Sequence, residues 1–240
     1  MREKRDSSFP REGDYPGSCT VCGRQTSFSV FKENRHLRET FICKHCGSMA
    51  RHRHLALVLS ETFGVSLPGE ITGLKVYNAE SSGPIHNVLK QHPGYTYSEF
   101  SQTNKGVRYE DLQQLSFADN SFDLVITQDV FEHIRKPMIA WQEIHRVLKP
   151  AGYHIFTIPC SKRIPTIPRV EVSGVEDIFI KPKVYHGEPT RDRLLYNNFG
   201  NDLAGVLEKQ GFATQVFWHD DLDRERFRIY AGAVFVSRKR

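Results

Sequence analysis

The sequence predicts an α/β fold with a doubly wound, mostly parallel sheet, preceded by a small cysteine-containing module. Residues 122–127 form an almost continuous apolar run, as in a strand covered by helices on both faces. Apolar residues then recur at helical spacing over 138–148, and residues 153–158 form a second apolar run. A strand, helix and strand in this order close right-handed with parallel strands, which sets the fold class.

Composition supports a folded protein without a membrane segment. The chain has 240 residues and 39% hydrophobic content, enough for one α/β domain and a small appendage. No apolar stretch approaches the roughly 18 residues of a membrane helix, and no apolar region follows the polar start. We therefore expect a cytoplasmic protein with no membrane partner.

Charge is concentrated near the N-terminus. Residues 1–66 hold eleven Lys and Arg against seven Asp and Glu, which accounts for +4 of the net charge of +5. Such a surplus is compatible with an anionic partner such as RNA, although a solvated basic face is the commoner explanation.

The N-terminal quarter contains the sharpest spacing in the chain. Residues 1–17 mix charge with Pro and Gly without any period, which predicts a mobile arm. Two Cys-x-x-Cys pairs follow within residues 18–66, separated by twenty residues, and each is followed by a glycine. The predicted ligands of one tetrahedral zinc ion are Cys19, Cys22, Cys43 and Cys46.

A closed four-cysteine site has a structural rather than a catalytic role, so the module is expected to resemble a zinc ribbon. Two disulfides or a redox dithiol are the alternatives. A cytosolic setting disfavours the first and the doubled motif disfavours the second. A helix over 48–63, capped by Ser48 and ended by Gly64, is expected to join this module to a main domain of residues 67–240.

The main domain begins with a predicted strand at 74–78 and a helix opening at Pro84. A second strand is predicted at 95–98 and a third at 106–110. At the C-terminal end a helix starting near Phe199 and stopped by Gly211 precedes two strands, at 213–218 and 227–237.

Four segments of the main domain carry a family resemblance. Residues 111–112, 115–125, 130–134 and 144–152 look like the class I, type 11 group of S-adenosylmethionine-dependent methyltransferases. The resemblance runs from about Leu74 to the C-terminus. It implies a Rossmann-like methyltransferase fold, a seven-stranded sheet that ends in an antiparallel pair, and S-adenosylmethionine as cofactor.

The resemblance also assigns the cofactor site. It places the methionine end at loop 79–83, the ribose hydroxyls at Glu99, and the adenine at Asp111 with the Leu112 backbone. In this loop Ala79 and Ser81 stand where the family has glycines, and Tyr77 stands where it has an acid. The predicted cofactor-binding residues are Ala79, Glu80, Ser81, Gly83, Glu99, Asp111, Leu112 and Gln128.

Substrate-contacting residues are predicted from position. His133 follows the 122–127 strand and titrates near neutrality, so it is the candidate catalytic base, with helix capping or lid packing as the alternative. Residues 160–198 carry four prolines among many basic residues, and a long segment of this kind is usually functional. The lid candidates, each with a plain surface loop as its alternative, are His186, Glu188, Arg191 and Tyr196.

Three functions remain open from the sequence. The first is methyl transfer to a small molecule. The second is RNA methylation, because ribosomal RNA guanine methyltransferases also place a cysteine-rich module before a type 11 domain. The third is a non-enzymatic binding module, suggested by the altered loop at 77–83.

Overall fold

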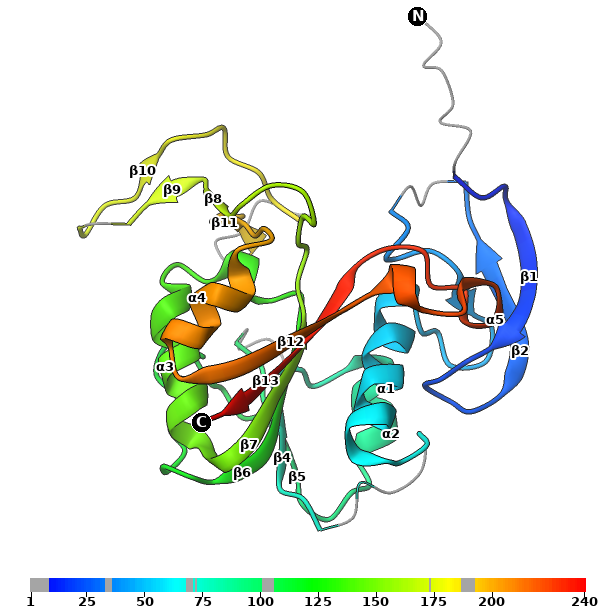
Figure 1. Ribbon diagram of the computed structural model, residues 1–240, viewed down its shortest axis with the longest axis horizontal. Coiled ribbons are helices and arrows are strands. Elements are labelled where there is room, and N and C mark those ends of the chain that lie inside the picture. The colour runs from blue at the N-terminus through cyan, green and yellow to red at the C-terminus, as the bar shows by residue number, and fades with distance from the viewer. Residues whose placement is uncertain are drawn as a thin grey trace, which may run out of the picture.

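The computed structural model describes residues 9–32, 36–67, 71, 73–100, 106–172, 174–186 and 193–240. A mixed six-stranded sheet lies between two layers of helices (Figure 1). In spatial order its strands are β12 (Phe212–Trp218), β13 (Ala233–Lys239), β7 (Leu148–Thr157), β6 (Phe122–Gln128), β4 (Val76–Asn78) and β5 (Tyr95–Tyr97). The strands β7, β6, β4 and β5 are parallel, and β13 is antiparallel to both of its neighbours.

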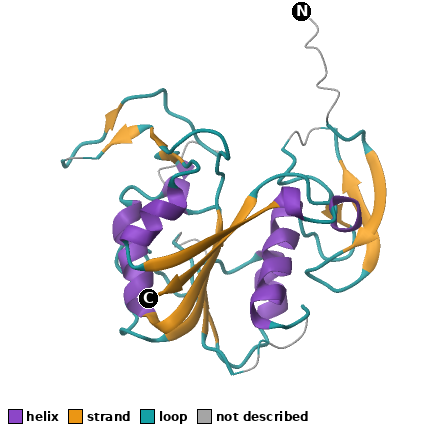
Figure 2. Ribbon diagram, in the orientation of Figure 1, coloured by secondary structure: helices purple, strands orange, loops and turns teal. Residues whose placement is uncertain are grey.

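Helices cover both faces of the sheet, as Figure 2 shows. One face is covered by α1 (Ala50–Phe63) and α2 (Gly83–Leu89), and the other by α3 (Pro137–Val147) and α4 (Leu203–Lys209). The predicted N-cap Ser48 is wrong, because helix α1 begins at Ala50 with Met49 as its N-cap; the helix ends as predicted at Gly64, which has a φ of 66°. No helix within the described residues is long and apolar enough to cross a membrane.

The central strand–helix–strand unit forms as the sequence predicts, with one shifted boundary. Strand β7 begins at Leu148 instead of residue 153. A bulge in β7 lies opposite residues 122–124 of β6, and β7 pairs with β6 both before and after this bulge. Ala151 takes a φ of 63° in this bulge. A Cβ on the next residue, Gly152, would lie 2.9 Å from the Lys149 carbonyl oxygen, so the bulge needs a glycine there.

The prediction of seven strands is wrong. The segment expected as the third strand, 106–110, pairs with the residues just after β5 only through an isolated bridge between Glu99 and Tyr109. Glu99 N donates to the Arg108 oxygen and Glu110 N donates to the Glu99 oxygen. The chain then turns at once, because the Asp111 carboxylate accepts a hydrogen bond from Gln113 N and closes a tight turn.

The last strand is also shorter than predicted at its start. Phe227, where the strand was expected to begin, instead ends the short helix α5 (Arg224–Phe227), which the Asp223 side chain caps by accepting a hydrogen bond from Arg226 N. Arg228 then takes a φ of 52°, and β13 begins at Ala233.

The N-terminal module is a small antiparallel sheet of β1 (Gly13–Ser18), β2 (Gln25–Val30) and β3 (Ile42–Cys43). Strand β1 includes residues 13–17, which the sequence analysis placed in a mobile arm, and residues 1–8 lie outside the described part of the chain. Buried residues of the module and of the sheet face under α1 belong to one hydrophobic cluster. This cluster runs from Phe28 through Leu55 to Ile155 and Val234.

Arg53 ties this module to the C-terminal end of the chain. Its guanidinium group is fully buried and lies 4.2 Å above the ring of Phe28. Its three nitrogens donate to the carbonyl oxygens of Ser48 at 2.7 Å, Phe227 at 2.8 Å and Arg228 at 2.9 Å. The side chain of residue 53 therefore holds α1 against the turn between β12 and β13.

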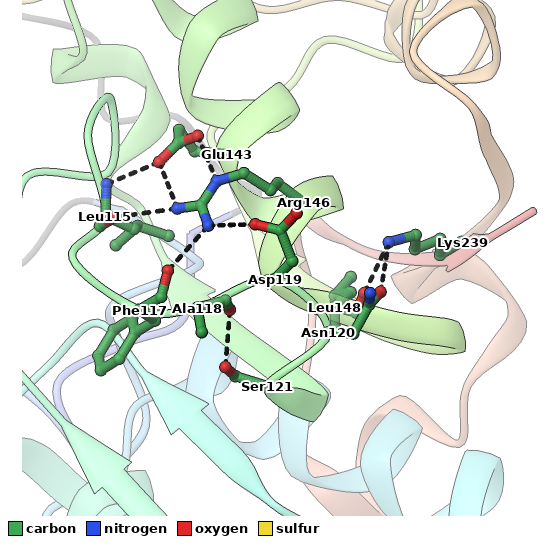
Figure 3. A network of polar contacts seen from close by, with 10 residues as sticks. All are labelled: Leu115, Phe117, Ala118, Asp119, Asn120, Ser121, Glu143, Arg146, Leu148 and Lys239. Atoms are coloured by element: carbon green, nitrogen blue, oxygen red, sulfur yellow. Dashed lines mark hydrogen bonds and ion pairs between the residues drawn. The ribbon is translucent and has the colours of Figure 1, made fainter.

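A second arginine explains part of the sequence motif at 144–152. Arg146 of α3 donates to the carbonyl oxygens of Leu115 and Phe117 and pairs with Asp119 and Glu143 (Figure 3). These contacts hold the loop before β6 against α3, so the motif arginine has a structural role.

The predicted lid lies above α3 and α4 (Figure 1). It contains two small antiparallel ladders, β8 (Ile167–Pro168) with β11 (Asn197–Asn198) and β9 (Val170–Glu171) with β10 (Ile178–Phe179). Its own buried cluster consists of Val170, Leu194 and Tyr196.

We expect Arg53→Met to destabilise the protein by about 3 kcal/mol or more, because three buried carbonyl oxygens would lose a charged donor. Thermal and urea unfolding measure the change. The matched control is Arg24→Met, since Arg24 is exposed in the same module and its loss should cost less than about 0.5 kcal/mol. Equal stability of the two variants would contradict the role given to Arg53.

Candidate functional site

The site lies where the direction of chain progression in the sheet reverses. From β4 the chain moves outward to β5 and then returns past β4 to β6, so β4 and β6 flank a topological switch point. Ligands of open α/β sheets bind beyond the carboxyl ends of the strands at such a point. Two loops follow these strands, residues 79–83 after β4 and residues 129–133 after β6. A hydrogen bond from Ala79 N to the Ile126 oxygen at 3.1 Å joins the first loop to strand β6.

The first loop is organised around two polar side chains. Asn78 Nδ2 donates to the Tyr95 hydroxyl at 2.8 Å and to the Glu80 oxygen at 3.2 Å. Gln128 Nε2 donates to the Glu80 carboxyl group, which links the first loop to the end of β6. Burial raises the pKa of Glu80 to about 7, although the charge of Arg51 opposes this shift. The carboxyl group of Glu80 can therefore hold or release a proton near neutral pH.

Gly83 shows why the loop needs a glycine at this position. It has a φ of +90°, a conformation that side chains with a Cβ rarely adopt. A Cβ placed there would meet only Glu80 Oε2, at 4.0 Å, so the space beside the loop is open. Among the loop positions compared with the family, Gly83 is the one whose backbone demands a glycine.

The second loop carries an ion-pair cluster that the sequence analysis did not find. Arg38 Nη2 donates to Asp129 Oδ1 at 2.6 Å, and Arg51 Nε lies 3.5 Å from Asp129 Oδ2. Burial alone would raise the pKa of Asp129, but the two guanidinium groups lower it, so the carboxylate stays charged. Asp129 has a φ of 50°, and Gly232 lies against Arg38 with a φ of 99° where a Cβ would be 2.9 Å from Arg38 Nε.

Several buried polar atoms around this cluster have no hydrogen-bond partner. Among them are Arg51 Nη1, Asn78 Oδ1 and Gln128 Oε1. Buried polar groups in native proteins are nearly always satisfied, and a group without a partner is often completed by a ligand or water. The site thus offers a charged donor and two neutral acceptors to a polar ligand.

The predicted catalytic base and one lid residue lie together. His133 is in the short helix η1 (Phe131–His133), and its Nδ1 lies 3.0 Å from the Leu194 oxygen of the lid. His186 Nδ1 lies 3.1 Å from His133 Nε2, and Glu132 Oε1 lies 3.8 Å from the same nitrogen. Burial and the nearby charge of Asp129 raise the pKa of Glu132 to about 8.

The other lid candidates are placed differently. Tyr196 is buried in the lid cluster and donates its hydroxyl hydrogen to Asp177 Oδ2 at 3.2 Å, which is a packing role. Arg191 and Glu188 lie outside the described residues. Cys160 donates to the Gly200 oxygen, and burial raises the pKa of its thiol to about 12, as for a buried small residue.

The residues assigned to the adenosine end lie along the same edge of the sheet. Glu99 follows β5 and is half-buried, and Asp111 ends the bridged segment beside it. Asp111 Oδ1 accepts from Gln113 N at 2.8 Å, and Leu112 is buried. Glu99 and Asp111 come together as the ends of neighbouring segments, while their roles toward a ligand remain predictions.

The four cysteines of the N-terminal module also cluster. Their sulfur atoms all lie within 4.8 Å of one another, and the Cys19 and Cys46 sulfurs are 3.7 Å apart. Four sulfurs at about 2.3 Å from a zinc ion are about 3.8 Å apart, so this spacing fits a tetrahedral site. Gly23 and Gly47, with φ of 69° and 72°, close the two turns by donating to the oxygens of Cys19 and Cys43.

Residues 77–156 match the family described as a methyltransferase domain. They contain the switch point, the 129–133 loop and the strand–helix–strand unit. Over these residues, a third of the chain, the protein is similar to that methyltransferase domain family.

A curated relative is similar over a short stretch of the chain. The protein is 42% identical over 50 residues to an uncharacterized methyltransferase of Schizosaccharomyces pombe. The aligned segment covers 21% of this chain and 18% of that relative, so the chain spans about a fifth of the relative's length.

Solved structures show the same fold at low identity. A Burkholderia thailandensis 1,6-didemethyltoxoflavin-N1-methyltransferase, solved with 1,6-didemethyltoxoflavin and S-adenosylhomocysteine, is 17% identical, with a TM-score of 0.53 and coverage of 79% of this chain and 78% of that one. A Pyrococcus horikoshii protein is 18% identical, with a TM-score of 0.52 and coverage of 80% and 90%. A Haloferax volcanii complex of the Trm112 methyltransferase activator and a putative methyltransferase gives 17% identity, a TM-score of 0.50 and coverage of 78% and 89%.

We expect Asp129→Asn to destabilise the protein by about 3 kcal/mol, because two buried guanidinium groups would lose their carboxylate. Asparagine tolerates the positive φ at this position, so the change isolates the charge. Chemical unfolding gives the value. Asp119→Asn, at an exposed ion pair, is the control and should cost less than about 1 kcal/mol. A loss for Asp129→Asn no larger than that of the control would show that the cluster does not hold the module in place.

Proposed function

We propose that the protein transfers a methyl group from S-adenosylmethionine to a small-molecule acceptor. The observation that carries the proposal is the set of buried, unpartnered polar atoms at the switch point of a methyltransferase domain. The amino-acid end of the cofactor carries a carboxylate and an ammonium group. Arg51 Nη1 is a matching donor for the carboxylate, and the acceptors Gln128 Oε1, Asn78 Oδ1 and Glu80 match the ammonium group.

The adenosine end is proposed to lie along the edge formed by Glu99 and Asp111. Glu99 would accept hydrogen bonds from the ribose hydroxyls, and Asp111 with the Leu112 backbone would bind the adenine edge. The small residues Ala79, Ser81 and Gly83 would leave room for close approach of the chain to the cofactor. This arrangement contains no phosphate-binding glycine loop, which suits a cofactor without phosphates.

Bound S-adenosylmethionine supplies an already activated methyl group, so the protein mainly has to orient the acceptor and take up a proton. The contact with the Leu194 carbonyl places the imidazole proton of His133 on Nδ1, because a carbonyl only accepts. Nε2 then carries a lone pair and is the atom that would accept a proton from the acceptor. His133 is accordingly proposed as the base.

A small-molecule acceptor is favoured over RNA by the use of the basic residues. Arg38 and Arg51 pair with Asp129, and Arg53 is buried, so much of the basic surplus near the N-terminus serves internal contacts. A phosphate backbone is bound by exposed Lys and Arg. The structural relative from Burkholderia thailandensis, which contains a bound small molecule, agrees with this choice.

We further propose that Cys19, Cys22, Cys43 and Cys46 bind one structural zinc ion. The spacing of their sulfurs supports this, as does the Ser48 hydroxyl, 3.2 Å from the sulfurs of Cys19 and Cys46. Four sulfurs complete the coordination, so the ion would leave no position open for chemistry. Thiolate ligands require a reducing compartment, which is the basis for proposing a cytoplasmic location.

Purified protein should contain one tightly bound zinc ion in the cysteine site, and Cys43→Ser should lose it together with stability. Because the module shares its hydrophobic cluster with the sheet, chelation should lower the unfolding temperature of the whole chain. Metal analysis and thermal unfolding test this. Cys160→Ser is the control and should keep both properties. Full zinc content in Cys43→Ser would rule out this ligand set.

Calorimetry should show binding of S-adenosylmethionine that strengthens by about tenfold between pH 6 and pH 8. The sign follows from Glu80: below pH 7 its carboxyl group is mostly neutral, and above pH 7 it is the anion that attracts the ammonium group. Glu80→Gln should bind more weakly at pH 8 and lose the pH dependence. Glu61→Gln, at an exposed position of α1, should behave as the parent does.

Failure of the parent protein to bind either S-adenosylmethionine or its demethylated product would contradict the proposed function and support the non-enzymatic binding module. If binding is found, cell extract incubated with radiolabelled cofactor identifies the acceptor class. Label in the small-molecule fraction is the expected result, and label in the RNA fraction would replace the proposed acceptor with RNA.

A further inference from the structure

The loop after β6 and the lid bring three potential metal ligands to one point. The atoms offered by Glu132, His133 and His186 all lie within 4.8 Å of one another. Two of the residues follow β6, and the third comes from the lid, 53 positions later in the chain. The sequence predicts His133 as a base and His186 as a lid residue, but no sequence pattern places them together.

The distances fit a shared metal ion. Ligand atoms at about 2.0–2.1 Å from a metal ion are about 3.0–3.4 Å apart, for octahedral and tetrahedral geometry respectively. His133 Nε2 and His186 Nδ1 are 3.1 Å apart, within this range. Glu132 Oε1 is 3.8 Å from His133 Nε2, so a small rotation of the carboxyl group would complete the set.

The outer contacts prepare His133 for metal binding. Its Nδ1 donates to the Leu194 oxygen at 3.0 Å, which fixes the ring and keeps the lone pair on Nε2. Metal-binding histidines commonly donate their other ring nitrogen to a carbonyl or carboxylate in this way. The backbone N–H of Tyr196 donates to the backbone carbonyl oxygen of Glu132 at 2.8 Å, which holds the lid against the same turn.

Glu132 provides an independent observation. Its side chain is 1% exposed, and neither carboxyl oxygen has a hydrogen-bond partner. A buried carboxyl group without a partner is costly, and a cation is a common way to satisfy it. A hydrogen bond between the two histidines would explain the 3.1 Å contact, but it would leave both oxygens of Glu132 unsatisfied.

We propose that Glu132, His133 and His186 bind a divalent transition-metal ion, with zinc as its representative. Two imidazoles and one carboxylate suit zinc or iron(II), whereas magnesium prefers oxygen ligands and water. Three protein ligands leave at least one coordination position open, unlike the cysteine site. The ion would also join the lid to the loop after β6, because His186 is its one ligand from the lid.

The metal site refines the role of His133 and narrows the acceptor class. Metal binding would use the lone pair of Nε2, so His133 would no longer take up the proton. The ion would instead lower the pKa of an acceptor group bound to it, and that group would release its proton to solvent water before methyl transfer. An acceptor able to use the open position carries an oxygen donor, such as a phenol, an enol or another hydroxyl group. This consequence rests on the proposed methyl transfer, whereas the metal site itself does not.

The test measures zinc binding in the full-length protein without any cofactor. Protein carrying zinc in its cysteine site is titrated with zinc chloride in a calorimeter, and its metal content is measured after gel filtration. Two zinc ions per chain are expected for the parent and one for His186→Ala. His186 is exposed, so its replacement should leave unchanged the unfolding temperature of protein that carries no metal at this second site.

His145→Ala, a histidine of α3 that faces Phe212, is the matched control and should still bind two zinc ions. Glu132→Gln should bind the second ion at least about tenfold more weakly. Equal zinc content in the parent and in His186→Ala would overturn the proposal. Because no cofactor is present, that result would leave the proposed methyl transfer intact, whereas loss of S-adenosylmethionine binding would leave the metal site intact.

Discussion

The salt-bridge cluster of Asp129 with Arg38 and Arg51 determines how the two parts of the chain fit together. Asp129 belongs to the loop at the end of the central strand, and both arginines come from the N-terminal part of the chain. The carboxylate is mostly buried and keeps its charge only because two guanidinium groups surround it. The N-terminal part of the chain therefore contributes to the candidate site, and its position affects the loop after β6 directly.

Much of the fold could be predicted because it depends on hydrophobic periodicity. Residues 122–127 and 138–148 gave the central strand and the helix that follows it, since burial on one or both faces leaves a clear period in the sequence. The missing seventh strand shows the limit of this reasoning. A short alternating segment does not encode how many residues pair, and at Asp111 a side-chain hydrogen bond ends the ladder after a single bridge.

The candidate site was predicted in its parts and not in its connections. The cysteine spacing and the position of His133 are local signals. Arg38 pairs with a residue 91 positions away, and His186 lies beside a residue 53 positions away. No periodic pattern records such contacts, so arginines that read as a basic surface turned out to be internal partners. The altered loop was clearer, because Gly83 keeps the positive φ that the turn requires.

The contacts of Arg53 have a consequence for how the chain is made. Its side chain binds the carbonyl groups of residues 227 and 228, which are separated from it by 174 and 175 positions. During synthesis from the N-terminus, the module and α1 emerge long before their partners in the last hairpin. Their apolar face stays uncovered until the hairpin residues 227–236 have also left the ribosome. Long-range contacts of this kind slow folding and favour a late, concerted closure of the sheet, so in the cell this protein is expected to rely on chaperones that shield the nascent N-terminal segment.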